Sequence, residues 1–133
     1  ASDAGISSMC RNLFPLASIV TPNLPEAHIL SNSTCMEGGD LGLLAKDIIG
    51  FGSESVLVKG GHLLGKDCID FFLLQSNPEG IEFRHPRLPG GPFRGTGCRL
   101  ASAIAARLAL GDDLVLAVEN ARRHLLGQLR DSR

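Results

Sequence analysis

The sequence has few aromatic side chains and no long apolar run. It contains no Trp, no Tyr and six Phe, so aliphatic residues must build most of its core. Hydrophobic residues make up 44% of the 133 positions, which suffices for one compact core, and we expect residues 1–133 to form a single domain. No apolar run approaches the roughly 20 residues that cross a bilayer, so no membrane partner is expected.

An excess of charge of either sign is also missing. The chain has 13 Lys and Arg against 14 Asp and Glu, a formal charge of −1. This balance provides no attractive field for a phosphate backbone, so no nucleic-acid partner is expected. Residues Ala1–Ile6 lack the charged and apolar regions of a signal peptide, and a cytoplasmic location is therefore expected by default.

Cysteine is scarce. The four cysteines, Cys10, Cys35, Cys68 and Cys98, are widely and irregularly spaced. Such spacing predicts neither a zinc cluster nor a disulfide framework, and we interpret them as reduced thiols. Glycine and proline are more informative, because sixteen Gly and seven Pro cluster between periodic segments and mark the turns of a folded domain.

Short apolar runs alternate with amphipathic segments. Ala17–Val20 and Val56–Val58 are continuous runs that predict buried strands. Apolar residues recur at intervals of three and four from Leu41 to Ile49, which predicts an amphipathic helix. Cys68–Leu74 and Ile81–Arg87 flank a turn sequence and predict an antiparallel hairpin.

Two helices are predicted near the C-terminal end, and Gly111 and Asp112 are expected to stop the first and start the second. Their apolar faces consist of Leu100, Ile104 and Leu108, and of Leu114, Ala117, Val118, Ala121 and Leu125. Buried strands separated by such helices favour an α/β fold with a mostly parallel sheet covered by helices on both faces. In such sheets ligands bind beyond the carboxyl ends of the strands.

The sequence Gly95-Thr96-Gly97-Cys98 directly precedes the first of these two helices. Glycines let the backbone approach a ligand closely, and the first N–H groups of a helix point outward unpaired. Together with the helix dipole, these groups attract phosphate. Spacing alone favours this anion site and an ordinary glycine-rich turn equally.

Cys98 is expected at the N-terminus of that helix, where the dipole favours the thiolate. A thiol there can act as a nucleophile or as a general base. None of His28, His62, His85 and His124 pairs with it by local spacing. Both roles, and that of an ordinary small buried side chain, therefore stay open.

Two further motifs follow the predicted strands. Asn23 and Glu26 have the spacing of a capping box, which explains them fully, although they could also hold a hydrated Mg²⁺ beside phosphates. Lys59, Gly60 and Gly61 fit a solvated turn at the end of a strand. Taken alone, this motif favours the turn, although Lys59 could also contact a phosphate while Gly60 and Gly61 leave space for a nucleotide.

Three motifs occur in the order Thr21–Ala27, Val58–His62 and Gly95–Cys98. In this order and spacing they resemble the hydroxymethylpyrimidine/phosphomethylpyrimidine kinases of thiamine biosynthesis, members of the ribokinase-like superfamily. The resemblance covers nearly the whole chain. It implies the C-terminal half of a ribokinase-like fold, since the N-terminal half of the family supplies several central strands and most of the pyrimidine pocket.

The resemblance also implies a kinase that uses ATP and Mg²⁺ to phosphorylate a hydroxymethylpyrimidine or its monophosphate, and a homodimer on family grounds alone. By this resemblance Glu26 binds the metal, and the nucleotide is bound by Asn23, Lys59, Gly60 and Gly61. The anion hole is formed by Gly95, Thr96 and Gly97, and Cys98 is the catalytic base.

Two positions depart from the family pattern. Arg94 stands where histidine is common, and Arg99 stands where a small hydroxyl residue is usual. Arg99 puts positive charge at the positive end of a helix, so either bound phosphate compensates for it or the site is tuned differently or degenerate. The alternatives to the pyrimidine kinase are a pyridoxal kinase with the same cysteine and a non-catalytic half-domain that binds nucleotide or a partner protein.

Overall fold

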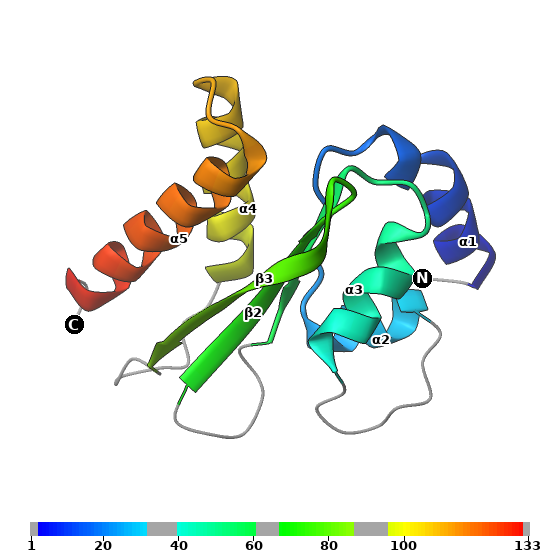
Figure 1. Cartoon of the computed structure of the whole chain (residues 1–133), viewed down its shortest axis with the longest axis horizontal. Helices are drawn as coiled ribbons and strands as arrows, with labels where there is room; N and C mark the ends of the chain where they lie inside the picture. Colours follow the sequence, from blue (N-terminus) through cyan, green and yellow to red (C-terminus); the bar gives the residue numbers. More distant parts are fainter. Residues whose placement is uncertain (1–2, 32–39, 61–66, 87–95, 132–133) are drawn as a thin grey trace. The chain divides into compact units, whose positions relative to one another are not determined.

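Figure 1 shows the computed structural model, which describes residues 3–31, 40–60, 67–86 and 96–131. The chain divides into two compact units, Ala1–Pro86 and Arg87–Arg133, and we describe each by itself. Among the described helices, none is long and apolar enough to cross a membrane.

The first unit combines helices with a three-stranded sheet. The strands lie in the order β1-β2-β3, and both neighbouring pairs are antiparallel. Its elements are α1 (Asp3–Asn12), the 3-10 helix η1 (Phe14–Leu16), α2 (Leu24–Ser31), α3 (Leu41–Ile49), β1 (Ser55–Lys59), β2 (Asp67–Leu74) and β3 (Asn77–Pro86).

The predicted antiparallel hairpin is confirmed. β2 and β3 pair with Cys68 opposite His85 and with Phe72 opposite Ile81. The turn is shorter than the sequence suggested, because β3 already begins at Asn77. The strand predicted at Val56–Val58 is also confirmed as β1, and its three residues are fully buried.

The prediction of a mostly parallel sheet is not confirmed in the described residues. β1 and β2 run antiparallel, because residues 60–66 alone connect them and a parallel crossover needs roughly a dozen residues. Parallel pairing is limited there to two isolated bridges, Val20 with Val56 and Asn23 with Lys59.

Residues Ala17–Val20, predicted as a strand, run beside β1 without a regular ladder. The N–H of Val20 donates to the carbonyl of Ser55 at 3.1 Å, and its carbonyl accepts from Leu57 at 2.8 Å. Pro22 lacks the backbone donor on the side that faces β1, so the pairing is interrupted between the bridges of Val20 and Asn23.

The core of the first unit lies between the sheet and the helices. Asp40 begins α3 by accepting the N–H of Gly42 at 2.8 Å, and the apolar side of α3 packs on β1 and β2. The predicted three-and-four spacing of this helix is confirmed, and each fully buried aliphatic side chain contributes about 1.5–3 kcal/mol. The buried cluster contains Cys10, Phe14, Leu24, Ala27, Leu41, Leu44, Ala45, Ile48, Val56, Val58 and Leu73.

The second unit is a helical hairpin of α4 (Thr96–Ala109) and α5 (Leu114–Asp131), as predicted. Gly111 stops α4 with a φ of 103°, which favours glycine. Its N–H donates to the carbonyl of Leu108, and the N–H of Asp112 donates to the carbonyl of Arg107. These two bonds form a Schellman motif.

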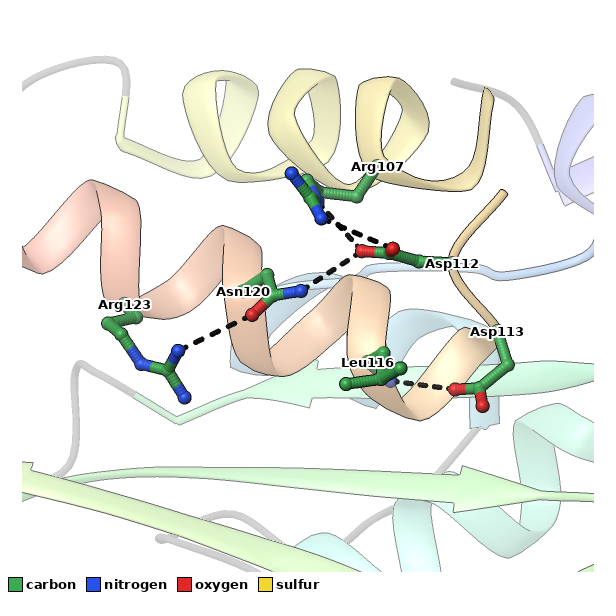
Figure 2. A network of polar contacts seen from close by, with 6 residues as sticks. All are labelled: Arg107, Asp112, Asp113, Leu116, Asn120 and Arg123. Atoms are coloured by element: carbon green, nitrogen blue, oxygen red, sulfur yellow. Dashed lines mark hydrogen bonds and ion pairs between the residues drawn. The ribbon is translucent and has the colours of Figure 1, made fainter. Parts of the chain in front are cut away.

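The predicted start of α5 at Asp112 is wrong by one residue. The carboxylate of Asp113 accepts the N–H of Leu116 at 2.8 Å and caps the helix (Figure 2). The carboxylate of Asp112 instead accepts hydrogen bonds from Nε of Arg107 at 2.7 Å and from Nδ2 of Asn120 at 3.0 Å. Two adjacent aspartates offer equivalent caps, and the contact with Arg107 decides between them.

Candidate functional site

Asn23 and Glu26 form a reciprocal capping box at the start of α2. Asn23 Oδ1 accepts the N–H of Glu26 at 2.9 Å, and Glu26 Oε1 accepts the N–H of Asn23 at 2.9 Å. The structural interpretation of this motif is confirmed. Glu26 remains exposed at the helix start, where the dipole favours its negative charge.

The first two motifs lie side by side. Asn23 forms a parallel bridge with Lys59, and the N–H of Lys59 donates to the carbonyl of Pro22 at 2.9 Å. Both segments end here, so Asn23, Glu26 and Lys59 meet at the carboxyl ends of two parallel stretches of backbone. This is the position where ligands bind in α/β folds.

Asp70 is a residue at this place that the sequence reasoning missed. It lies opposite Lys59 in the register of β1 and β2 and is only 6% exposed. Its Oδ1 accepts the N–H of Gly60 at 3.1 Å, and the same N–H donates to the carbonyl of Ile69 at 2.9 Å. A buried carboxylate is costly unless it is hydrogen-bonded, and this contact holds the backbone that follows Lys59. The sequence signal that could have identified Asp70 is its position as the acidic residue within the otherwise apolar run Cys68–Leu74.

Cys98 lies in the first turn of α4, and its side chain is exposed. The helix begins at Thr96, so Thr96 and Gly97 lie in its first turn and not before it, where the sequence had predicted them. Gly95 and Gly61 lie outside the described residues. The motifs thus fall in different units, with Asn23, Glu26, Lys59 and Gly60 in the first and Cys98 in the second. Their assembly into one site stays a prediction.

Arg99 has a partner inside its own unit. Its guanidinium donates to Gln128 Oε1 on α5 at 2.9 Å. Packing between the two helices therefore gives this charge a neutral acceptor. Arg94 lies outside the described residues.

The cysteines differ in their surroundings. Cys10, Cys68 and Cys98 are free thiols, as predicted, and Cys35 lies outside the described residues. Burial raises the pKa of the Cys10 thiol, which keeps it protonated and inert. Cys98, by contrast, is exposed.

The described residues contain no cluster of three or more His, Cys, Asp or Glu side chains that could hold a metal ion. Mg²⁺ needs no such cluster, because it commonly keeps several waters and binds through one or two carboxylates and the phosphates of a substrate. Exposed Glu26 fits this mode of binding, with Asn23 beside it.

A sequence model of the family described as phosphomethylpyrimidine kinase matches residues 1–133. The chain belongs to this family. The resemblance seen in the three motifs is thereby confirmed.

Named relatives agree with this family. The chain is 38% identical over 125 residues to the thiamine biosynthesis bifunctional protein ThiED of Geobacter sulfurreducens, covering 94% of this chain and 25% of that protein. It is 33% identical to the hydroxymethylpyrimidine/phosphomethylpyrimidine kinase of Aquifex aeolicus, covering 99% of this chain and 51% of that protein. The chain thus spans about half of the length of one of these relatives and a quarter of the other.

Solved structures of phosphomethylpyrimidine and pyridoxal kinases share the ribokinase-like fold. An ADP complex of Bacillus subtilis pyridoxal kinase matches with a TM-score of 0.84 at 26% identity, covering 92% of this chain and 48% of that one. Phosphomethylpyrimidine kinase of Clostridium difficile matches with a TM-score of 0.73 at 28% identity, covering 96% of this chain and 50% of that one. The predicted α/β, ribokinase-like class is therefore confirmed as a partial fold.

Proposed function

We propose that the chain is the nucleotide-binding part of a kinase that transfers a phosphoryl group from ATP to hydroxymethylpyrimidine or its monophosphate in thiamine biosynthesis. The bridge between Asn23 and Lys59 carries this proposal, because it joins two of the three family motifs at the carboxyl ends of parallel backbone segments. The names of the relatives and the family membership support the same reaction.

In this proposal the residues act by position and charge, as phosphoryl transfer generally requires. Lys59 meets the phosphates as a point charge, and Gly60 and Gly61 leave space for the nucleotide. Asn23 and Glu26 orient water molecules around Mg²⁺, which neutralises phosphate charge when it is bound.

At the second unit, the backbone N–H groups of Gly95, Thr96 and Gly97 hold the oxygens of the transferred phosphoryl group. Cys98 takes the proton of the acceptor hydroxyl as this oxygen attacks phosphorus. Its exposed side chain is suited to meeting a substrate.

Calorimetric titration of this chain with Mg·ATP tests the nucleotide site. Replacing Lys59 by Ala removes the phosphate contact, and we expect Kd to rise about tenfold, equivalent to roughly 1.4 kcal/mol. Lys46→Ala, an exposed lysine on α3, is the matched control and leaves Kd unchanged. Equal affinities for the two variants contradict the role of Lys59.

A test of the catalytic role of Cys98 requires a polypeptide that contains this chain and has the full length of its relatives. Cys98→Ala is expected to lower pyrimidine-dependent ADP release by about 10²–10⁴-fold while ATP binding persists. Undiminished turnover removes Cys98 from the mechanism.

A pyridoxal kinase is the second candidate, because the pyridoxal kinase structure gives the higher TM-score of the two structures compared above. Side-by-side turnover with pyridoxal and hydroxymethylpyrimidine separates these enzymes. ATP binding without ADP formation in the presence of either acceptor identifies a non-catalytic half-domain instead. A homodimer belongs to the proposal on family grounds, and a cytoplasmic location stays an expectation.

A further inference from the structure

Asp70 occupies a place in β2 where folding alone favours an apolar side chain. The residue is only 6% exposed, and Phe72, which lies two residues later and therefore on the same side of the strand, is fully buried. In the neighbouring strands Asp70 lies opposite Lys59 of β1 and Phe83 of β3. Moving a carboxylate out of water costs free energy, so the burial of Asp70 opposes folding unless its contacts compensate.

The hydrogen bond from Gly60 to Asp70 is not needed to satisfy the backbone. The N–H of Gly60, a buried residue, donates to the carbonyl of Ile69 at 2.9 Å and also to Oδ1 of Asp70 at 3.1 Å, which is a three-centre hydrogen bond. Without the carboxylate, this N–H keeps its backbone partner. The contact therefore adds little stability, and residues that depart from the preferences of folding in this way are typical of functional sites.

The side chain of Lys59 is not used by Asp70. The two residues lie directly opposite each other, at a separation where oppositely charged side chains of neighbouring strands commonly pair. Within the part of the chain that the structure describes, however, half-buried Lys59 forms no ion pair. The carboxylate instead contacts the backbone one residue later, so it constrains the path of the chain after Lys59 and leaves the ammonium group available for an anion.

We infer that Asp70 is a positioning residue of the nucleotide site, which holds the backbone of Lys59 and Gly60 in the geometry that meets the phosphates of ATP. In this role Asp70 acts through Lys59 and contacts neither the nucleotide nor the metal. The inference rests on the proposed function, and it adds to that site a residue outside the three family motifs.

Calorimetric titration with Mg·ATP and thermal unfolding together separate a positioning role from a structural one. Asp70→Val puts an apolar, β-branched side chain into a buried strand, so the thermal midpoint should equal or exceed that of the unsubstituted chain. Its Kd for Mg·ATP should rise about tenfold, because the backbone after Lys59 is no longer held. Ser55→Ala is the matched control. It removes a buried hydroxyl at the other end of β1, which donates to the carbonyl of Ser18 at 2.7 Å, and it should lower the thermal midpoint with Kd unchanged.

Two further variants test how Asp70 acts. Asp70→Asn keeps an oxygen acceptor on a side chain of the same shape, so Kd should stay within about twofold of the unsubstituted value. In Lys59→Ala the phosphate contact through which Asp70 acts is already lost. Adding Asp70→Val to that variant should therefore raise Kd by less than about a further twofold, as expected for coupled residues.

Three results overturn the inference while the unsubstituted chain binds Mg·ATP and the proposed function stands. One is an unchanged Kd in Asp70→Val. Another is unfolding of this variant, or a fall of its thermal midpoint like that of Ser55→Ala, which gives Asp70 a structural role. The third is an additive rise of about a hundredfold in the double variant, which makes Asp70 independent of Lys59. If the unsubstituted chain does not bind Mg·ATP, the proposed function itself is contradicted, and this inference with it.

Discussion

Glu26 has two carboxylate oxygens, and the capping box uses one of them. Its Oε1 accepts the N–H of Asn23, and the residue remains exposed. A carboxylate accepts several hydrogen bonds, so the second oxygen can contact a hydrated cation while the cap persists. The structural and functional interpretations of this motif are therefore compatible.

The two roles of Glu26 can be separated by substitution. Glu26→Gln keeps a capping side chain, so the free energy of unfolding should change by less than about 0.5 kcal/mol, while Mg·ATP affinity falls with the lost charge. Glu26→Ala removes both the capping side chain and the charge, and it should lower the free energy of unfolding by about 1 kcal/mol. Urea unfolding and calorimetric titration measure the two effects. Unchanged Mg·ATP affinity in the Gln variant contradicts a metal role.

Gly80 shows how one residue can determine a hairpin. It has a φ of 76°, and a Cβ built there would overlap with Cζ of Phe71. The Phe71 ring thus covers Gly80 across the two strands, and Phe71 also contacts the position of Gly42 at the start of α3. The aromatic ring therefore contacts both β3 and the start of α3.

Gly80→Ala is accordingly expected to destabilise the chain by about 1–3 kcal/mol, through steric overlap and an unfavourable φ. Gly127→Ala is the matched control, because it lies in α5 with open space around its Cα and should stabilise the helix by about 0.5–1 kcal/mol. Denaturant unfolding of the two variants should give changes of opposite sign.

At the scale of elements, the α4–α5 hairpin depends on a local polar network (Figure 2). The guanidinium of Arg107, and then the amide of Asn120, lower the pKa of Asp112 by hydrogen bonding to its ionised carboxylate. Since folding lowers this pKa, ionised Asp112 stabilises the hairpin above the ordinary pKa of aspartate. The contribution is lost as the pH falls through the lowered, folded-state pKa.

Asp112→Asn should therefore lower the thermal midpoint of α-helical circular dichroism at neutral pH, and the difference from the unsubstituted chain should vanish in strong acid. Asp47→Asn, an exposed aspartate on α3, is the control and should have little effect at either pH. A difference for Asp112→Asn that persists in acid contradicts the ion-pair explanation.

At the scale of the whole molecule, the expected single domain stays a prediction, because contacts within the chain gather into two units. If one cooperative domain exists, amides of β1 and α4 should lose their protection at the same denaturant concentration. Hydrogen exchange along a denaturant series measures this. Earlier opening of α4 and α5 indicates a helical hairpin that unfolds independently.

Several elements were predictable because their causes are local. The spacing of apolar residues in α3, α4 and α5 reports directly on which helix face is buried. The hairpin follows from two strand-like runs around a turn sequence. Strand direction was wrongly predicted, because the continuous apolar run of β1 is typical of a parallel sheet. The short connection after β1 allows only antiparallel pairing with β2.

The sequence by itself determined the capping box of Asn23 and Glu26, the end of α4 at Gly111 and the family, because caps and motifs depend on neighbours within a few residues. The tertiary structure alone decided that Asn23 lies beside Lys59, that Asp70 supports Gly60 and that Asp113 rather than Asp112 caps α5. The first two of these contacts join segments that are separate in the sequence, and the third distinguishes two adjacent aspartates that are equivalent as caps. Packing, which selects one arrangement for the whole unit, makes that choice.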